Sequence, residues 1–151
     1  MRIDLDDLTD ADTIAFLEGH VSELRALSPP ESTHTLDLEG LRAPGVTFWS
    51  ARDGDRVVGC AALKRLDDTH AEVKSMRTAT DLARRGIATA LLRTVLEHAR
   101  DAGFGRVSLE TGAEDFFAPA RALYARHGFV ECEPFADYRP DPLSVFMTRE
   151  L

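Results

Sequence analysis

The sequence predicts a single α/β domain built on a mixed, mostly antiparallel sheet that is split at its centre and flanked by helices. Three stretches of strand character are joined by short turns, and short turns make neighbouring strands antiparallel. A later strand–helix–strand unit adds a parallel pair, because its right-handed crossover returns the chain to the same end of the sheet. At 151 residues and 44% hydrophobic content, the chain can bury one packed core. We therefore expect one domain over residues 1–151.

The expected strands are hydrophobic runs bounded by turn residues, namely residues 2–5, 46–51, 56–65, 71–78, 106–111, 129–130 and 143–148. Turns at Asp53-Gly54 and Asp67-Asp68-Thr69 join the second, third and fourth strands. The last strand, extended to Arg149, is a candidate sheet edge. A second subunit could pair there, which would give a homodimer.

Helices are expected over about residues 10–27, 36–41, 86–100 and 115–127. Asp10 or Asp12 caps the first helix, and prolines 29 and 30 end it. The third helix has an apolar residue at every fourth position, namely Ile87, Leu91, Val95 and Ala99. Pro119 in the first turn and Gly128 just past the end delimit the last helix. The polar stretch over residues 31–44 is the expected mobile lid or substrate loop.

Charge and cysteine content narrow the class of protein. A net charge of −8 and a pI near 5.1 argue against a nucleic-acid partner, which needs a basic face. Cys60 and Cys132 lack metal-ligand spacing, so neither a metal site nor a disulfide framework is expected. Cys60 is expected to pack as a small hydrophobe and not to act as a nucleophile. The start of the chain lacks a signal-peptide core, and no apolar run approaches the roughly 20 residues of a membrane span, so we expect a cytoplasmic protein without a membrane partner.

The segment Arg84-Arg85-Gly86-Ile87-Ala88 joins an extended stretch to a helix. The N–H groups in the first turn of a helix have no partner within the helix, and the helix dipole adds about half a positive charge there. The glycine lets an anion approach closely, and the two arginines supply countercharge. A local excess of arginine on an acidic chain therefore predicts a site for a compact polyanion, such as a nucleotide-bearing cofactor.

Three further segments follow this turn in order: Leu109-Glu110-Thr111-Gly112, Ala120-Arg121-Ala122-Leu123-Tyr124 and Gly128-Phe129. Together with the turn and the start of the helix after it, this ordered set closely resembles the GNAT superfamily of acetyl-CoA-dependent N-acetyltransferases. The resemblance covers at least residues 71–129, and the C-terminal part looks like a bacterial small-substrate branch. Ala83 departs from the pattern, because the family has Gln or Arg there, and this removes one side-chain contact to the cofactor.

The resemblance implies the acyl-CoA N-acyltransferase fold, with acetyl-CoA as co-substrate and no metal. The pyrophosphate would lie on N–H groups near the turn, and the pantetheine arm would pair along the strand before it. The implied cofactor-binding residues are Met76, Arg77, Thr78, Arg84, Arg85, Gly86, Ile87, Ala88 and Thr89. The implied reaction is direct transfer of the acetyl group to an amine of a small molecule or peptide.

The resemblance also implies that Tyr124 gives a proton to the departing CoA thiolate. With reference pKa values of about 10 for tyrosine and 8.5 for a thiol, this transfer costs about 2 kcal/mol. An amine with a pKa near 10.4 must lose its proton before it attacks. Transfer of that proton to a glutamate with an ordinary pKa of about 4.3 costs roughly 8 kcal/mol. Glu72 is the first candidate for the base, directly or through water, followed by Glu110 and His70. A backbone N–H near Met76 would donate a hydrogen bond to the oxyanion of the tetrahedral intermediate.

Other interpretations compete with these. Glu72 could be an exposed strand carboxylate paired with Lys74 or Arg65. Tyr124 could be a core tyrosine with a satisfied hydroxyl. A protein that binds acyl-CoA as a sensor, without catalysis, is the alternative function.

The sequence gives the least information about the identity of the acceptor amine. Arg25, in the segment between His20 and His34, is a candidate for binding an acceptor carboxylate. The late segment Asp137-Tyr138-Arg139 is a second candidate lining of the acceptor pocket. Both are hypotheses from position and charge alone.

Overall fold

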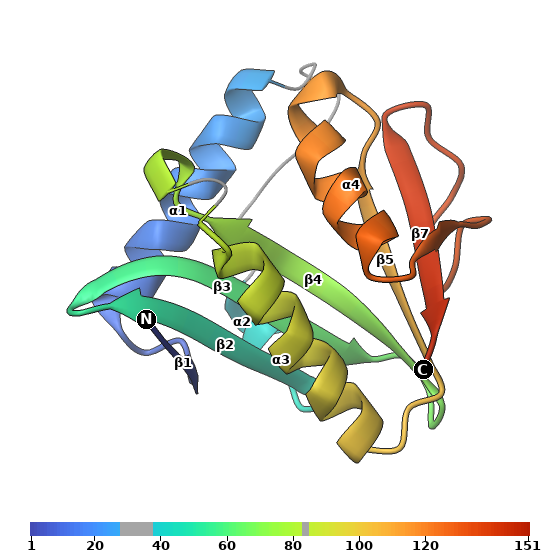
Figure 1. The fold of residues 1–151 in the computed structure, drawn as a ribbon, viewed down its shortest axis with the longest axis horizontal. Helices are drawn as coiled ribbons and strands as arrows, with labels where there is room; N and C mark the ends of the chain where they lie inside the picture. The colour runs from blue at the N-terminus through green and yellow to red at the C-terminus, as the bar shows by residue number, and fades with distance from the viewer. Residues whose placement is uncertain (28–37, 83–84) are drawn as a thin grey trace. The chain divides into compact units, whose positions relative to one another are not determined.

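The computed structural model describes residues 1–27, 38–82 and 85–151, with side chains described outside residues 20–27. Seven strands form a sheet in the order β1-β2-β3-β4-β5-β7-β6 (Figure 1). They are β1 Arg2–Leu5, β2 Val46–Asp53, β3 Arg56–Arg65, β4 His70–Thr78, β5 Arg106–Gly112, β6 Val130–Glu131 and β7 Ser144–Glu150. The helices are α1 Ala11–Leu27, α2 Leu38–Arg42, α3 Ile87–Asp101 and α4 Ala118–Arg126. Short 3-10 turns cover Thr80–Leu82 and Asp115–Phe117.

The predicted elements are present, and their boundaries differ by a few residues. Asp115 begins a 3-10 turn, and α4 starts only at Ala118, with Pro119 in its first turn as predicted. Gly128 has a φ of 87°, which confirms the left-handed residue after α4. Residues 31–37 of the predicted lid lie outside the described residues, as do Ala83, Arg84 and the side chain of Arg25, whereas residues 38–42 of that stretch form α2.

The mixed character of the sheet is confirmed by its registers. β4 pairs parallel to β5, whereas β5 pairs antiparallel to β7, and β1 antiparallel to β2. The prediction that β7 is a sheet edge is wrong, because β7 pairs with β5 on one side and with β6 on the other. None of the described helices is long and apolar enough to cross a membrane.

The chain forms two compact units, one of residues 1–62 and 75–91 and the other of residues 63–74 and 92–151. Within β4 the boundary falls between Lys74 and Ser75. Ser75 has a φ of 53°, a left-handed conformation that a residue with a side chain seldom adopts. The change of unit thus coincides with a local distortion of the strand.

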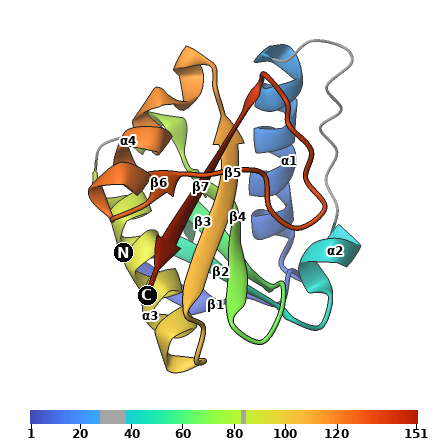
Figure 2. The same cartoon turned by 90° about the vertical axis from the view of Figure 1, so that its right-hand side faces the viewer.

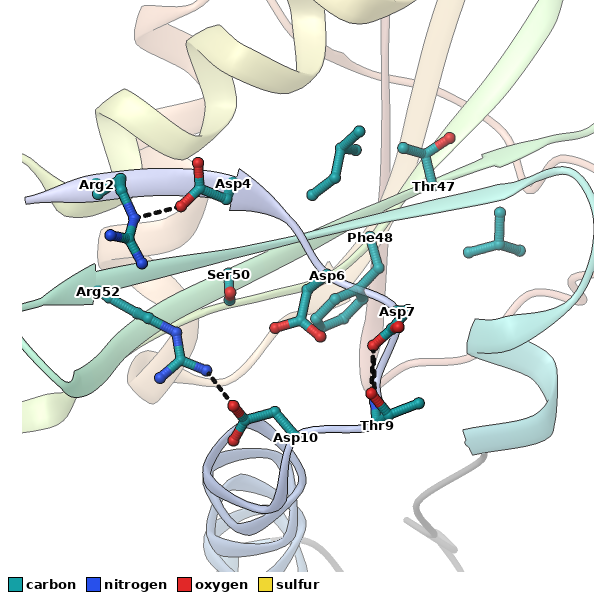
Figure 3. Close-up of a pocket in the computed structure, with 12 residues that line it drawn as sticks. Arg2, Asp4, Asp6, Asp7, Thr9, Asp10, Thr47, Phe48, Ser50 and Arg52 are labelled. Carbon is teal, nitrogen blue, oxygen red and sulfur yellow. Dashed lines mark hydrogen bonds and ion pairs between the residues drawn. The ribbon is translucent and has the colours of Figure 1, made fainter.

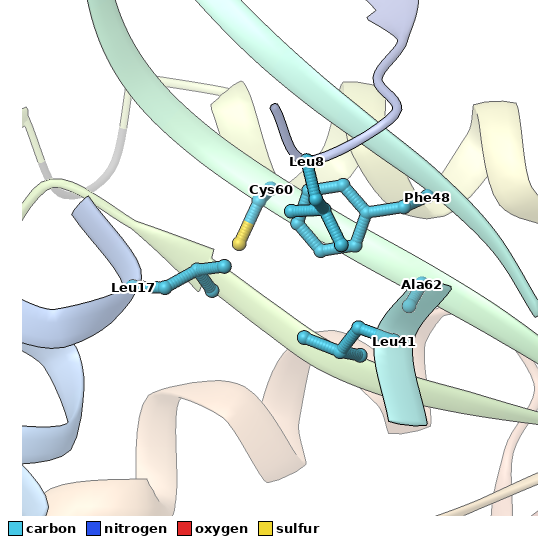
Figure 4. Packing of buried hydrophobic residues seen from close by; sticks show 6 residues of the cluster. All are labelled: Leu8, Leu17, Leu41, Phe48, Cys60 and Ala62. Atoms are coloured by element: carbon cyan, nitrogen blue, oxygen red, sulfur yellow. The ribbon is translucent and has the colours of Figure 1, made fainter. Parts of the chain in front are cut away.

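The first unit buries the cluster Leu8, Leu17, Leu41, Phe48, Cys60 and Ala62 (Figure 4). The Cys60 thiol is fully buried and donates to the carbonyl oxygen of Ser75 at 3.1 Å. Burial raises the pKa of this thiol to about 12. Cys60 is therefore a small core residue, as predicted, and has none of the thiolate character that a nucleophile needs.

In the second unit, β5 pairs with β7 along its whole length, from Arg106 to Gly112. Figure 2 shows α4 on one side of these strands, while the loop between β6 and β7 crosses to the other side. Leu109 of β5 and Met147 of β7 are direct partners in the register, and both are buried. Polar residues alternate with them, so the face under the β6–β7 loop is the candidate for chemistry.

Candidate active site

The turn before α3, in the first unit, has the backbone geometry of an anion site. Gly86 has a φ of 80° and is exposed, and the first α-helical hydrogen bond of this segment runs from the Ala90 N–H to the Gly86 carbonyl at 3.0 Å. Among the described residues, no backbone carbonyl accepts from the N–H groups of residues 87–89, so these groups can bind a ligand. Arg85 is exposed beside them, whereas the Ile87 side chain is buried. Ile87 can thus contribute only its backbone.

Gly59 sets how closely α3 approaches the sheet in this unit. A Cβ added at Gly59 would lie 2.9 Å from the Arg77 carbonyl oxygen and 2.9 Å from the Leu91 side chain. It would also lie 3.0 Å from the side chain of Ile87. The first turn of α3 therefore packs directly on β3, and only glycine allows this. Gly59 was not among the predicted residues, although a glycine inside an apolar strand is a signal of close backbone approach.

The second half of β4 carries the predicted cofactor residues Met76, Arg77 and Thr78. The register of β4 with β5 covers only His70–Glu72 opposite Arg106–Ser108. Met76 is buried, and Arg77 and Thr78 are partly buried. Beyond them, the Ala79 N–H donates to the Val58 carbonyl at 2.9 Å, so this end of β4 is held by β3.

One face of the second unit gathers polar side chains from three strands. In the registers Glu72 is opposite Ser108, Ser108 is opposite Thr148, and His70 lies two residues before Glu72 on the same face. Glu110 follows two residues after Ser108 and is exposed. The structure therefore brings the three predicted base candidates, Glu72, Glu110 and His70, to one face of the sheet.

Glu72 is only 3% exposed, and its Oε2 atom accepts a hydrogen bond from the Tyr138 hydroxyl at 2.5 Å. Burial raises the pKa of Tyr138 far above its usual value, and the hydrogen bond to Glu72 and the charges of Glu72 and Glu110 act in the same direction. Tyr138 is thus the donor. The interpretation of Glu72 as an exposed carboxylate paired with Lys74 or Arg65 is wrong.

Tyr138 was predicted only to line the acceptor pocket, and its contact with Glu72 was not predicted. The two residues are 66 positions apart. No spacing rule connects a strand residue to a loop residue at such a distance, so only the fold shows the pair.

His70 belongs to a chain of hydroxyl groups. Its Nε2 atom lies 2.6 Å from Ser108 Oγ, which lies 2.8 Å from Thr148 Oγ1, and Arg106 donates to Thr148 Oγ1 at 2.9 Å. Because arginine can only donate, Thr148 Oγ1 accepts from Arg106, and the Thr148 hydroxyl can itself donate to Ser108 or to the Val107 carbonyl oxygen, 3.4 Å away. The Ser108 hydroxyl can donate to His70 Nε2 or accept from it, depending on the tautomer of the ring.

The electrostatic surroundings agree with a neutral His70. Burial lowers its pKa, and the Arg106 charge lowers it further, against the opposing charges of Asp67 and Glu72. A neutral imidazole has one ring nitrogen that can take up a proton, so His70 stays a base candidate beside Glu72 and Glu110.

Tyr124 lies in α4 and is 7% exposed, with its ring centroid 5.8 Å from that of Phe129. α4 is tied to the end of β5 by Arg121, which donates to the carbonyl oxygens of Gly112 at 2.6 Å and Glu114 at 3.0 Å. The start of α4 is thus held beside the end of β5 by side-chain to backbone bonds. The burial of Tyr124 fits both a core role and a catalytic role.

An open cavity of about 620 Å³ lies in the first unit, beside β1, β2 and the start of α1 (Figure 3). Its carboxylates are engaged locally: Asp6 accepts from the Leu8 N–H and the Thr13 hydroxyl, and Asp10 pairs with Arg52 at 3.1 Å. They stabilise the turn into α1. Among the described residues, no group of three His, Cys, Asp or Glu side chains is arranged to hold a metal ion.

Comparisons with known proteins converge on one family. A model of the "Acetyltransferase (GNAT) family" matches residues 8–129. The chain is 50% identical over 151 residues to the uncharacterized N-acetyltransferase YsnE of Bacillus subtilis (strain 168), with 100% of both chains covered.

Solved structures share the fold. A protein of Klebsiella pneumoniae subsp. pneumoniae MGH 78578, assigned as an acyl-CoA N-acyltransferase, has a TM-score of 0.81 at 28% identity, covering 99% of this chain and 97% of that one. A GNAT family acetyltransferase from Elizabethkingia anophelis, crystallised with acetyl-CoA bound, has a TM-score of 0.71 at 18% identity, with 99% and 97% covered. The second similarity concerns the fold alone.

Proposed function

The chain belongs to the GNAT acetyltransferase family and is an acetyl-CoA-dependent N-acetyltransferase, and we propose that Glu72 and Tyr124 carry its proton transfers. The observation that carries the assignment of Glu72 is its burial on the polar face of the second unit, with a neutral hydroxyl donor as its partner. A catalytic base needs a carboxylate that is not neutralised by an arginine or a lysine.

The proposed reaction transfers the acetyl group directly. The nitrogen of the acceptor amine attacks the thioester carbonyl and loses a proton to Glu72, directly or through water. The C–S bond breaks, and Tyr124 donates its proton to the departing CoA sulfur. Glu72 then releases the amine proton to solvent and Tyr124 takes one up, so that both residues return to their starting states and the products are the N-acetylated amine and CoA.

We assign the pyrophosphate of acetyl-CoA to the N–H groups of residues 87–89, with Arg85 as countercharge. The positive φ of Gly86 and the close packing of α3 on β3 at Gly59 support this assignment. The N–H groups at a helix start bind phosphate oxygens through several short contacts, none of which needs a side chain. Met76, Arg77 and Thr78 are the proposed partners of the pantetheine arm, and Arg84, outside the described residues, remains a proposed second countercharge.

The proposed acceptor is an amine of a small molecule or a peptide. The whole range 1–151 is proposed as one N-acetyltransferase domain, because the matched range 8–129 includes parts of both units. A sensor that binds acetyl-CoA without turnover is not favoured by the family assignment.

A thiol-release assay with purified protein, acetyl-CoA and a panel of amines tests the function. We expect CoA release that depends on the amine and falls about 100-fold in Tyr124→Phe, because a positioned general acid contributes roughly 10²–10⁴-fold. The variant keeps the ring that packs on Phe129, so its melting temperature and its calorimetric affinity for acetyl-CoA should match those of the wild type. Full turnover in Tyr124→Phe would contradict the assignment of Tyr124, and tight CoA binding without any product would favour the sensor.

A further inference from the structure

We propose that Tyr138 is a positioning residue for acetyl transfer: its hydroxyl holds the Oε2 atom of Glu72, so that Oε1 is the atom that receives the amine proton. The inference rests on the proposed role of Glu72 as the base. One oxygen of the Glu72 carboxylate then makes a structural hydrogen bond, and the other takes part in the reaction.

The phenol of Tyr138 is itself fixed by aromatic contacts on the loop between β6 and β7. Its ring centroid lies 5.1 Å from that of Phe135 and 5.5 Å from that of Phe146, and those two rings are 6.0 Å apart. Phe146 is buried in β7, so the trio fastens the loop to the strand. Edge-to-face and tilted contacts of this kind restrict ring motion. Tyr138 can therefore hold a carboxylate in one orientation.

The second oxygen of Glu72 differs from the first. The hydrogen bond from Tyr138 is made to Oε2, and among the described residues Oε1 has no hydrogen-bond partner. No fully buried side-chain oxygen of the described residues lacks a partner. Oε1 must therefore keep some accessible surface, even though Glu72 as a whole is 3% exposed.

The neighbouring polar groups are used in other hydrogen bonds and do not compete for Oε1 of Glu72. Ser108 is opposite Glu72 in the register, but its hydroxyl is used in the chain between His70 and Thr148. Arg106 donates to Thr148 and Glu150. Tyr138 stays protonated far above neutral pH, because burial and the charges of Glu72 and Glu110 oppose its ionisation. It is a donor throughout and does not compete for the amine proton.

The test compares Tyr138→Phe with Phe135→Leu, using the best acceptor found among phenethylamine, lysine, alaninamide and trialanine. Tyr138→Phe keeps the ring and loses only the hydroxyl, whereas Phe135→Leu loosens the aromatic trio and keeps the hydroxyl. We expect kcat to fall about 10- to 100-fold in Tyr138→Phe, with little change in calorimetric affinity for acetyl-CoA. The acid limb of the kcat/KM profile should move to higher pH, because a hydrogen bond to the ionised form of a carboxyl group favours that form.

Phe135→Leu should lower the melting temperature without moving the acid limb. In a Glu72→Gln background, Tyr138→Phe should cause little further loss, because the two residues act as one unit. An unchanged acid limb in Tyr138→Phe, or fully additive losses in the double variant, would overturn the inference while wild-type turnover leaves the proposed function standing. Absence of turnover by the wild type with every acceptor would instead count against the proposed function itself.

Discussion

The carboxylates of the two units stand in opposite surroundings. Beside the start of α1, Asp6 and Asp10 line an open cavity and are occupied by backbone N–H groups, a threonine hydroxyl and an arginine. In the second unit, Glu72 is nearly fully buried and accepts one bond from a neutral phenol. The first region has more charge, but the second has a carboxylate oxygen that is desolvated and not neutralised. Burial and the type of partner, and not the number of acidic residues, mark the candidate for chemistry.

The largest expected effect separates these two regions. Glu72→Gln should lower kcat/KM by about 10²–10⁴-fold, because a positioned general base contributes that much. Asp7→Asn, in the other region, is the matched control and should keep the wild-type rate, since within the described part of the chain Asp7 accepts hydrogen bonds from Thr9 alone. Steady-state kinetics on both variants checks the difference. If Asp7→Asn lost as much activity as Glu72→Gln, the comparison would fail; if Glu72→Gln kept full activity, Glu110 would become the base candidate.

A second, smaller effect concerns the turn before α3. Gly86 and Gly54 both have positive φ, 80° and 60°, with nothing within 4 Å of an added Cβ. Alanine at either position should therefore lower the free energy of unfolding by about 1 kcal/mol through backbone strain alone. Only Gly86→Ala should also weaken acetyl-CoA binding, by about 3- to 10-fold, because its methyl group and altered backbone disturb the N–H groups there. Calorimetry on the two variants distinguishes the effects, and equal affinities would contradict the proposed pyrophosphate site.

The smallest expected effect is on His70. Its lowered pKa means that the unfolded chain binds protons more readily than the folded one near pH 6.5, so stability rises with pH and this contribution is lost as the pH falls below about 6.5. An NMR titration should show His70 titrating below the ordinary histidine value. A pKa of His70 at or above that ordinary value would contradict the effect of burial.

The two regions also differ in how well the sequence predicts them. The turn before α3 is a contiguous segment, and helix physics makes its N–H groups available whatever the rest of the chain does, so it could be predicted. The three base candidates could be named from their strands, because alternation puts residues two apart on one face. Neither the Tyr138 partner of Glu72 nor the hydroxyl chain to His70 could be predicted, because each joins residues that are distant along the chain.

The prediction that β7 is a sheet edge was wrong for a similar reason. β7 has the composition of a final strand, and nothing in residues 144–150 indicates that the two-residue strand β6 pairs beside it. Gly59 was overlooked for a different reason, because a glycine in a strand gives no sign of which helix side chain lies above it.

By itself, the sequence determined the element order, the strand–turn–helix segment around Gly86 and the family pattern, since local hydrogen bonding and periodicity act over a few residues. The tertiary structure alone decided which carboxylate is buried, which hydroxyl holds it and which hydroxyl lies beside His70. These depend on contacts across β4, β5, β7 and the β6–β7 loop, where desolvation and hydrogen-bond direction are set by residues that only the folded chain brings together.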